Sequence, residues 1–235
     1  MQIASINPES TIDYPGKYGP IIFTLGCSFQ CGFCHNPELV NGDSGLINQE
    51  EFGMFLKNLK IKSKRGWYTG ICISGGEPTQ QKDLPEFILE IKQYGLAVKL
   101  DTNGSNPEML RKLLEEKLVD YAAMDIKSKK EDYFKIVNRN INLENIGKSI
   151  KLVKQFPDYE FRTTVLPFFE ENDFEEIGKW ISEDKKVKLY SLQQFNPKKT
   201  LDSEYGKMIP KTKQELEAFA EIMKDYSENV RILGC

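Results

Sequence analysis

The sequence predicts an α/β fold, a partial (β/α)6 barrel whose six-stranded parallel sheet is open on one side and has its helices outside. Short apolar, β-branched runs alternate with amphipathic stretches, which is typical of a parallel sheet covered by helices. Polar residues follow four consecutive strands, at the edge where such folds bind ligands. Packing alone does not explain this arrangement, so we expect the sheet to curl around a site.

Composition and charge indicate an ordinary globular protein. The 235 residues are 40% hydrophobic and 29% charged, with a net charge of -3. No Pro/Gly/Ser-rich stretch divides them, so we expect one domain over residues 1–235, with an N-terminal extension (1–19), a barrel core (20–195) and a C-terminal loop, helix and short strand (196–235). The mixed charges argue against nucleic-acid binding. No apolar run approaches the ~20 residues of a membrane span and no signal peptide is evident, so we expect a cytoplasmic protein.

The first half of the chain alternates between strands and helices. Periodic apolar residues predict helices around 52–59 and 87–91, and Gly95 can end the second. Asn106 caps a third helix, with Pro107 at its first position. The strands predicted here cover 21–25, 71–74, 97–100 and 121–126.

The second half continues the same alternation. Apolar periodicity predicts a helix over 143–153 and another that Asp173 opens. Thr212 and Glu215 form a capping box before a last helix. The strands predicted here cover 161–166, 187–192 and, as a short final strand, 230–233.

Three cysteines follow the first predicted strand in a C-x3-C-x2-C pattern: Cys27, Cys31 and Cys34. Soft thiolates select iron–sulfur clusters, zinc or copper(I). Three ligands leave one position open, which is typical of a catalytic metal site. The alternative is a structural zinc site completed by His35, the single histidine of the chain. Because Cys34 and His35 are adjacent, joint ligation of one metal is awkward, and we expect His35 to lie in the wall of a cofactor pocket.

The two remaining cysteines stand apart from this cluster. An odd total of five argues against a disulfide framework. Cys72 lies in an apolar run and is expected in the core, whereas Cys235 is expected to be a free surface thiol.

Polar motifs follow the next three strands. Paired glycines allow close approach of backbone to a ligand, and the carboxylates and lysine bring charge to the same edge of the sheet. The motifs are Gly75-Gly76-Glu77-Pro78 after the second strand, Asp101-Thr102-Asn103-Gly104 after the third, and Asp125-Ile126-Lys127 after the fourth.

The cysteine pattern directly after the first strand resembles the signature of the radical S-adenosylmethionine (SAM) superfamily. In that family the three cysteines bind a 4Fe-4S cluster, and the amino and carboxylate groups of SAM chelate its fourth iron. The G-G-E-P tetrapeptide is similar to the family motif that binds the SAM amino group. The resemblance therefore implies a cluster on Cys27, Cys31 and Cys34, and a SAM site made by Phe33, His35, Asn36, Gly75, Gly76, Glu77, Pro78, Asp101, Thr102, Asn103, Asp125, Lys127 and Val165.

The D-T-N-G and D-x-K motifs resemble the branch of the superfamily that activates glycyl radical enzymes. In that branch the two aspartates and the threonine line a monovalent-cation site beside the SAM carboxylate. The resemblance implies such a site at Asp101, Thr102 and Asp125, with the Ala123 carbonyl as a further ligand. It also implies that Lys127 contacts or positions SAM.

Further segments are similar to activating proteins of anaerobic ribonucleoside-triphosphate reductase; they are residues 12–17, 34–39, 161–165 and 193–195. This resemblance implies an oxidoreductase that cleaves SAM reductively and places a radical on a backbone glycine of that reductase. It also implies an electron donor such as flavodoxin or ferredoxin. We expect the loops 38–47 and 196–211 to receive the glycine loop of the partner.

Two other functions are compatible with parts of the pattern. Relatives that make 7-carboxy-7-deazaguanine share the small size and the G-G-E-P motif, and act on a small pterin. A zinc-stabilised interaction protein without catalytic activity would explain the cysteines, but it would not explain the polar motifs at the other strand ends.

Overall fold

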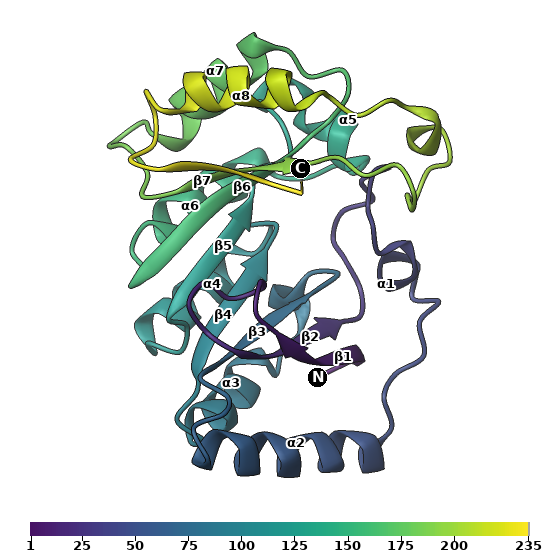
Figure 1. Cartoon of the computed structure of the whole chain (residues 1–235), viewed down its shortest axis with the longest axis vertical. Helices are drawn as coiled ribbons and strands as arrows, with labels where there is room; N and C mark the ends of the chain where they lie inside the picture. The colour runs from purple at the N-terminus through teal and green to yellow at the C-terminus, as the bar shows by residue number, and fades with distance from the viewer. Residues whose placement is uncertain (235) are drawn as a thin grey trace.

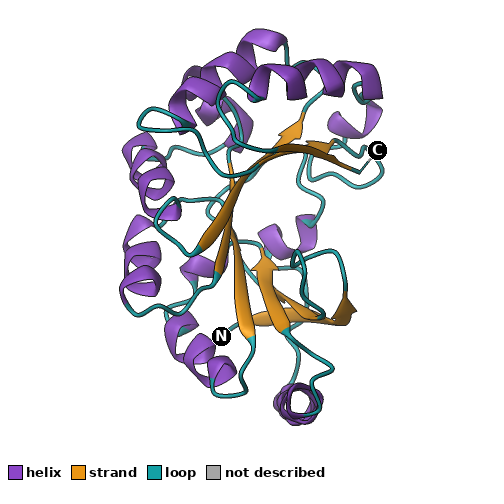
Figure 2. Cartoon of the chain, turned by 60° about the vertical axis from the view of Figure 1, so that its left-hand side comes forward, coloured by secondary structure: helices purple, strands orange, loops and turns teal. Residues whose placement is uncertain are grey.

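A computed structural model describes residues 1–234 of the chain as a single curved sheet with helices on its convex side (Figure 1, Figure 2). The first two strands are antiparallel, and all later neighbours are parallel. The strands follow one another in chain order across the sheet: β1 (Ile3–Ser10), β2 (Gly19–Thr24), β3 (Gly70–Gly75), β4 (Ala97–Thr102), β5 (Tyr121–Asp125), β6 (Asp158–Val165), β7 (Tyr190–Gln194) and β8 (Val230–Leu233).

The helices connect successive parallel strands. Figure 2 shows most of them outside the curved sheet, while the two ends of the sheet do not meet, so the barrel is partial. The α-helices are α1 (Pro37–Asn41), α2 (Gln49–Lys64), α3 (Leu84–Lys92), α4 (Pro107–Glu115), α5 (Tyr133–Val137), α6 (Leu143–Val153), α7 (Glu171–Ile181) and α8 (Lys213–Met223). Three short 3-10 helices are η1 (Pro78–Gln80), η2 (Lys130–Asp132) and η3 (Tyr205–Lys207).

The predicted partial barrel is confirmed, and the sheet extends beyond it at both ends. The six predicted strands correspond to β2–β7. The segment expected as an N-terminal extension contains β1, which pairs with β2. Only Ile3 of this strand is buried, so it lacked the apolar pattern that marks the other strands. The short final strand, β8, joins the sheet in parallel to β7.

Two predicted boundaries are corrected by the structure. The helix expected to open at Asp173 begins at Glu171. Asp173 is its third residue, and its carboxylate accepts a hydrogen bond from the backbone N–H of the N-cap residue Glu170 at 2.8 Å. The strand expected from residue 187 begins at Tyr190, and Val187 forms only an isolated bridge to Ser227. The caps predicted at Asn106 and Thr212 are present.

The main hydrophobic core lies between the convex face of the sheet and the helices. Alternate strand residues such as Ile22, Ile73, Val98 and Leu100 face the helices. The matching helix residues include Leu59, Ile88, Leu110, Ile146, Ile150, Phe174 and Leu216, all of which are buried. Cys72 is buried as predicted, and Cys235 lies outside the described residues.

Because the seven strands β2–β8 are parallel, their carboxyl ends meet at one edge of the sheet. The loops after β2, β3, β4 and β5 therefore converge, which brings together motifs separated by up to a hundred residues. Within residues 1–234, no helix combines the length and the hydropathy needed to cross a bilayer.

Candidate active site

A cavity of about 300 Å³ lies at the carboxyl edge of the sheet and collects the predicted site residues. Its walls come from β2 to β7 and from the cysteine loop that follows β2. The predicted residues that line it are Cys27, Cys31, Phe33, Cys34, His35, Asn36, Gly75, Gly76, Glu77, Pro78, Asp101, Thr102, Asn103, Asp125 and Lys127.

Val165, predicted at the SAM site, and Ala123, predicted at the cation site, are not among the residues that line the cavity. Val165 is fully buried in the hydrophobic core. Successive side chains of a strand point to opposite faces, and on β6 the cavity side is taken by Arg162 and Thr164. On β6, Thr164 and Arg162 rather than Val165 therefore line the cavity, and a contact between Val165 and SAM stays a prediction.

The three cysteine thiols open into the cavity from one tight loop. The backbone N–H of Cys34 donates to the Cys31 carbonyl at 3.0 Å, and the N–H of Phe29 donates to the Cys27 sulfur at 3.4 Å. A second donor to Cys27 Sγ is the side-chain amide of Asn103, at 3.7 Å. Burial raises the pKa of Cys27 to about 11 and that of Cys31 to about 12.

This donor set fits an iron–sulfur cluster better than a single zinc ion. Buried thiolates need a compensating cation, and soft sulfur ligands select iron–sulfur clusters or zinc. Within residues 1–234, no group of three or more His, Cys, Asp or Glu side chains is placed to hold one metal ion. In a 4Fe-4S cluster each cysteine binds its own iron, so the thiols need not converge on one point.

Gly75 and Gly76 seat the cysteine loop on the end of β3. A Cβ atom on Gly76 would lie 2.0 Å from the Gly26 carbonyl oxygen, and one on Gly75, whose φ is +129°, would lie 2.2 Å from the Thr24 nitrogen. The backbone N–H of Gly76 donates to Thr24 O at 2.9 Å, and that of Glu77 donates to Gly26 O at 2.7 Å. The close approach that requires these glycines is thus to the backbone just before Cys27.

Glu77 is fully buried and joins the ends of β3 and β4. Its Oε1 accepts hydrogen bonds from the Thr79 N–H at 3.1 Å, from the Thr79 hydroxyl and from the Thr102 hydroxyl at 2.8 Å. Its Oε2 accepts from the Asn103 N–H at 2.6 Å. Burial raises the pKa of Glu77 above its usual value, while these hydrogen bonds oppose the rise. Glu77 therefore fixes Asn103, whose side chain reaches the cysteine loop.

A network of buried charges forms the opposite wall of the cavity. Arg162 lies opposite Asp125 in the parallel register of β5 and β6, and donates from Nε to Asp125 Oδ1 at 2.8 Å. The other side of its guanidinium approaches Asp101, with Nη1 3.3 Å from Oδ1. Lys127 binds Asp125 Oδ2 at 2.9 Å, and Lys99 forms an ion pair with Asp101.

These ion pairs keep both aspartates charged. Burial by itself would raise the pKa of Asp125, but the positive charges of Arg162 and Lys127 hold it well below its usual value. Asp101 follows the same pattern: burial opposes ionisation, and Arg162 and Lys99 lower its pKa. The wall therefore presents ionised, paired groups to any ligand in the cavity.

The side chains expected to bind a monovalent cation are engaged by the protein itself. Asp101 and Asp125 share the guanidinium of Arg162. The hydroxyl of Thr102 donates to Glu77 and accepts from the Gly104 N–H at 3.1 Å. These three residues do not fit a free cation in this arrangement.

The remaining wall comes from the residues around Cys34. Phe33 is buried, and the ammonium of Lys127 lies 5.8 Å from the centre of its ring. His35 Nδ1 lies 3.2 Å from the carbonyl oxygen of Lys199, and burial lowers the pKa of the imidazole. Asn36 stands at the N-terminus of α1 but its side chain makes no capping bond there.

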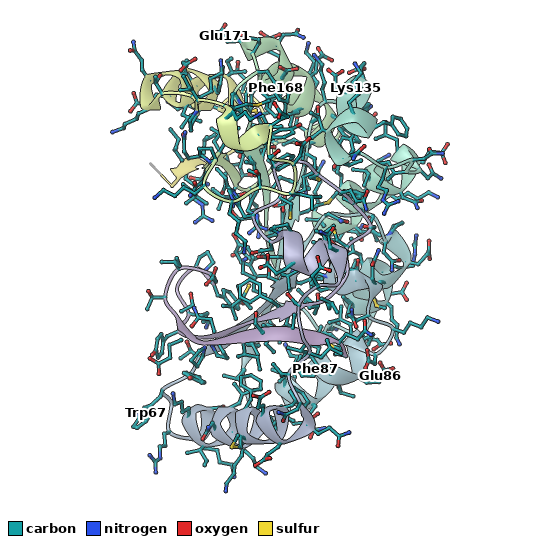
Figure 3. All side chains as sticks on the ribbon, turned by 90° about the vertical axis from the view of Figure 1, so that its right-hand side faces the viewer. Trp67, Glu86, Phe87, Lys135, Phe168 and Glu171 are labelled. Carbon is teal, nitrogen blue, oxygen red and sulfur yellow. The ribbon has the colours of Figure 1, made fainter. Side chains whose placement is uncertain are left out.

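The loop 196–211 packs against the cysteine loop. A Cβ atom added to Gly32 would lie 2.5 Å from the ring of Tyr205. The ring centroid of Tyr205 lies 6.1 Å from the ring centroid of Phe33. Tyr205 also helps to line a separate cavity, together with Lys135 and Phe168. Figure 3 shows Lys135 and Phe168 at the end of the molecule opposite Trp67. One of the two loops expected to meet a partner thus lies beside the cysteine loop.

Three charged residues at the site were not predicted from the sequence: Asp13 and Arg162, which line the cavity, and Lys99, which pairs with Asp101. Arg162 belongs to a segment used for the family resemblance, and its place opposite Asp125 would have followed from the strand register. Lys99 interrupts an otherwise apolar strand two residues before Asp101, on the same face. That position was a usable signal, because a lysine inside a buried strand requires a partner.

Comparisons with known proteins agree with this geometry. The family model described as Radical SAM superfamily matches residues 21–181. A Methanocaldococcus jannaschii protein named as a glycyl-radical enzyme activating enzyme is 35% identical over 98% of this chain and 95% of its own length. A pyruvate formate-lyase-activating enzyme of Streptococcus mutans is 27% identical, over 83% of this chain and 77% of its own length.

A solved structure shares the fold at low sequence identity. Streptococcus suis SuiB, in a crystal structure bound to S-adenosylmethionine, superposes with a TM-score of 0.67 at 16% identity, over 90% of this chain and 49% of SuiB. The cysteine loop, the paired glycines and the charged strand ends thus occur on a fold that SuiB shares. The chain belongs to the radical SAM superfamily.

Proposed function

We propose that this chain is an activating enzyme that cleaves SAM reductively and generates a glycyl radical on a partner protein. The observation that carries the proposal is the convergence of three cysteine thiols, the G-G-E-P turn and the paired charges of Asp101, Asp125 and Lys127 on one cavity. The names of the similar proteins from M. jannaschii and S. mutans support this class of partner.

The cofactors of the proposal are a 4Fe-4S cluster held by Cys27, Cys31 and Cys34, and SAM. The chemistry supplied by a bound cluster and SAM is one-electron cleavage of the sulfonium, which yields methionine and a 5'-deoxyadenosyl radical able to take a hydrogen atom from glycine. The chain contributes three ligands, leaves one iron for SAM, and limits water through the buried walls at Phe33 and Phe29.

Each wall of the cavity has a proposed role toward SAM. The turn from Gly75 to Pro78 and Asn103 face the amino group, and Lys127 and Arg162 offer positive charge to the carboxylate. Phe33, His35 and Asn36 line the side next to the cysteines. Orientation of a bound substrate by such fixed groups lowers the entropic part of the activation barrier.

The partner is proposed more narrowly as anaerobic ribonucleoside-triphosphate reductase, on the resemblance of residues 12–17 and 34–39 to its activating proteins. A flavodoxin or ferredoxin is the proposed electron donor. The strand order β1 to β8 does not close into a complete barrel, and this open arrangement supports a protein substrate.

The test uses the chain reconstituted anaerobically with iron and sulfide. With dithionite and SAM it should form 5'-deoxyadenosine, and with a co-encoded reductase it should produce a glycyl radical in electron paramagnetic resonance. Cys34→Ser should abolish both signals, and a reductase whose radical glycine is replaced by alanine should abolish only the second.

The outcomes separate the competing functions. Formation of 5'-deoxyadenosine without a glycyl radical in any candidate reductase would favour a small substrate, such as that of the 7-carboxy-7-deazaguanine synthases. A folded, colourless protein that holds zinc and never cleaves SAM would refute the enzyme altogether.

A further inference from the structure

Lys99 is a buried cation below the floor of the cavity. Its side chain is 2% exposed and its ammonium pairs with Asp101, a residue that lines the cavity. The same ammonium lies 3.8 Å from the sulfur of Cys72 and 5.9 Å from the ring centre of Tyr121. Its surroundings therefore offer one carboxylate, one thiol and one aromatic face, and the carboxylate is the strongest of these partners.

Arg162 provides a second fixed cation between the two aspartates. Its side chain is 12% exposed, and its guanidinium contacts both Asp101 and Asp125. Burial opposes its charge, yet Asp101 and Asp125 raise its pKa well above the usual value, so it stays protonated. Each aspartate thus contacts Arg162 and one lysine, Lys99 or Lys127.

The charges of this network leave a surplus. Asp13 and Glu77 also line the cavity but stand outside this set of ion pairs. Within the set, Lys99, Lys127 and Arg162 contribute three positive charges and Asp101 and Asp125 contribute two negative ones, so one positive charge remains. One anionic group, such as the carboxylate of an amino acid, would balance it. An added metal cation would double the surplus and would have to displace ion-paired side chains in a poorly hydrated place.

We propose that the side chains of Lys99 and Arg162 act as tethered cations in place of the monovalent metal ion that the resemblance implies at Asp101 and Asp125. SAM binding by this chain is then independent of potassium and sodium. This inference rests on the proposed function only in naming SAM as the ligand. Lys99 acts here as a positioning residue, since it reaches the cavity through Asp101.

The first experiment compares salts with the unmodified chain. The reconstituted protein is placed in potassium, sodium or tetramethylammonium chloride at equal ionic strength, and the dissociation constant of SAM and the melting temperature are measured. Tetramethylammonium is too large to occupy a carboxylate site for a small ion. We expect the dissociation constants to agree within about twofold, far less than the tenfold change that 1.4 kcal/mol would produce.

The second experiment removes the tethered charge. Lys99→Ser takes away the ammonium and leaves space beside Asp101. In tetramethylammonium this variant should bind SAM about tenfold more weakly, the scale of one lost charge-assisted hydrogen bond. Potassium or sodium should restore most of the affinity and raise the melting temperature, because a small cation can then enter.

A matched control separates this effect from general loss of an ion pair. Lys92 binds Asp120 at 2.7 Å, away from the cavity lining. Lys92→Ser should show no difference between potassium and tetramethylammonium in either measurement. Lys99→Arg keeps a cation at this position, so its SAM affinity and melting temperature should not depend on the choice of salt. This variant tests the inference if Lys99→Ser does not fold.

The inference is overturned if the unmodified chain binds SAM several-fold more tightly in potassium or sodium than in tetramethylammonium. It is also overturned if folded Lys99→Ser shows no response to small cations. Failure to bind SAM in any salt would instead contradict the proposed function, and the melting temperatures would still decide the role of Lys99.

Discussion

The carboxylate of Glu77, which follows β3, accepts a hydrogen bond from the backbone N–H of Asn103, which follows β4, at 2.6 Å. The side-chain amide of Asn103 in turn donates to Ser28 Oγ at 3.0 Å and to Cys27 Sγ at 3.7 Å. One buried carboxylate thus connects the ends of two strands with the cysteine loop. The geometry of the cysteine loop therefore depends on a residue that is not one of the proposed cluster ligands.

Replacement of Glu77 by glutamine should destabilise the fold. The new amide group would face hydrogen-bond donors, leaving buried donors without an acceptor, at a cost of about 2 kcal/mol or more. Urea unfolding measures the change. Glu86→Gln is the control, because Glu86 is 67% exposed and pairs only loosely with Lys112 at 3.5 Å. Equal midpoints for both variants would contradict the role assigned to Glu77.

Gly76→Ala should impair cluster assembly. The added Cβ would overlap the Gly26 carbonyl oxygen at 2.0 Å, so the backbone before Cys27 must move. Iron and sulfide content after reconstitution should fall by more than half, and the protein should lose at least about 1–3 kcal/mol of stability to overpacking. Gly53→Ala, in α2 with open space around it, should keep its iron and gain up to about 1 kcal/mol. Full iron content in Gly76→Ala would show that the loop tolerates the shift.

The cysteines should divide cleanly by function. Serine at Cys27, Cys31 or Cys34 should each prevent stable iron binding, since only three protein ligands are available in the proposed site. Cys72→Ala should retain full iron content while costing about 2 kcal/mol or less, because Cys72 is a buried side chain on the inner face of the sheet. Elemental analysis and the visible absorption of the cluster provide the measurement. Loss of iron in Cys72→Ala alone would require another ligand set.

Acid should unfold the chain partly through Asp125. Its pKa in the folded state lies below its unfolded value, so its stabilisation is fully present above about pH 4 and is lost as the pH falls further. Asp125→Asn should cost about 3–5 kcal/mol at neutral pH, because Arg162 and Lys127 would lose a buried partner. Below pH 4 the variant should lose stability less steeply than the unmodified chain. Parallel slopes in urea unfolding across this range would contradict the assignment.

Much of this protein follows from local sequence patterns. Apolar periodicity located the strands β2–β7 and the principal helices, because burial on one face imposes a repeat of two or about 3.6 residues. The caps at Asn106 and Thr212 could also be predicted from local sequence, because each depends on a residue only three positions away. Even the convergence of the motifs was predictable, because parallel strands share one carboxyl edge.

Other features depend on contacts between distant segments. β1 has only one buried residue and is stabilised by pairing with β2, so no local apolar pattern predicted it. The curvature and register of the sheet decide which side of β6 faces the cavity. As a result Thr164 and Arg162 line the cavity, and Val165, which was expected there, does not.

The sequence by itself determined the superfamily, the three-cysteine motif and the edge of the sheet where that motif lies, because short motifs and strand periodicity are local properties of the chain. Only the tertiary structure decided how the charges pair. Arg162 lies between Asp101 and Asp125, and Lys99 reaches Asp101 from within the barrel. The physical reason is that the energy of a buried ion depends on its distance to every neighbouring charge, and those distances exist only once strands from separate parts of the chain are side by side.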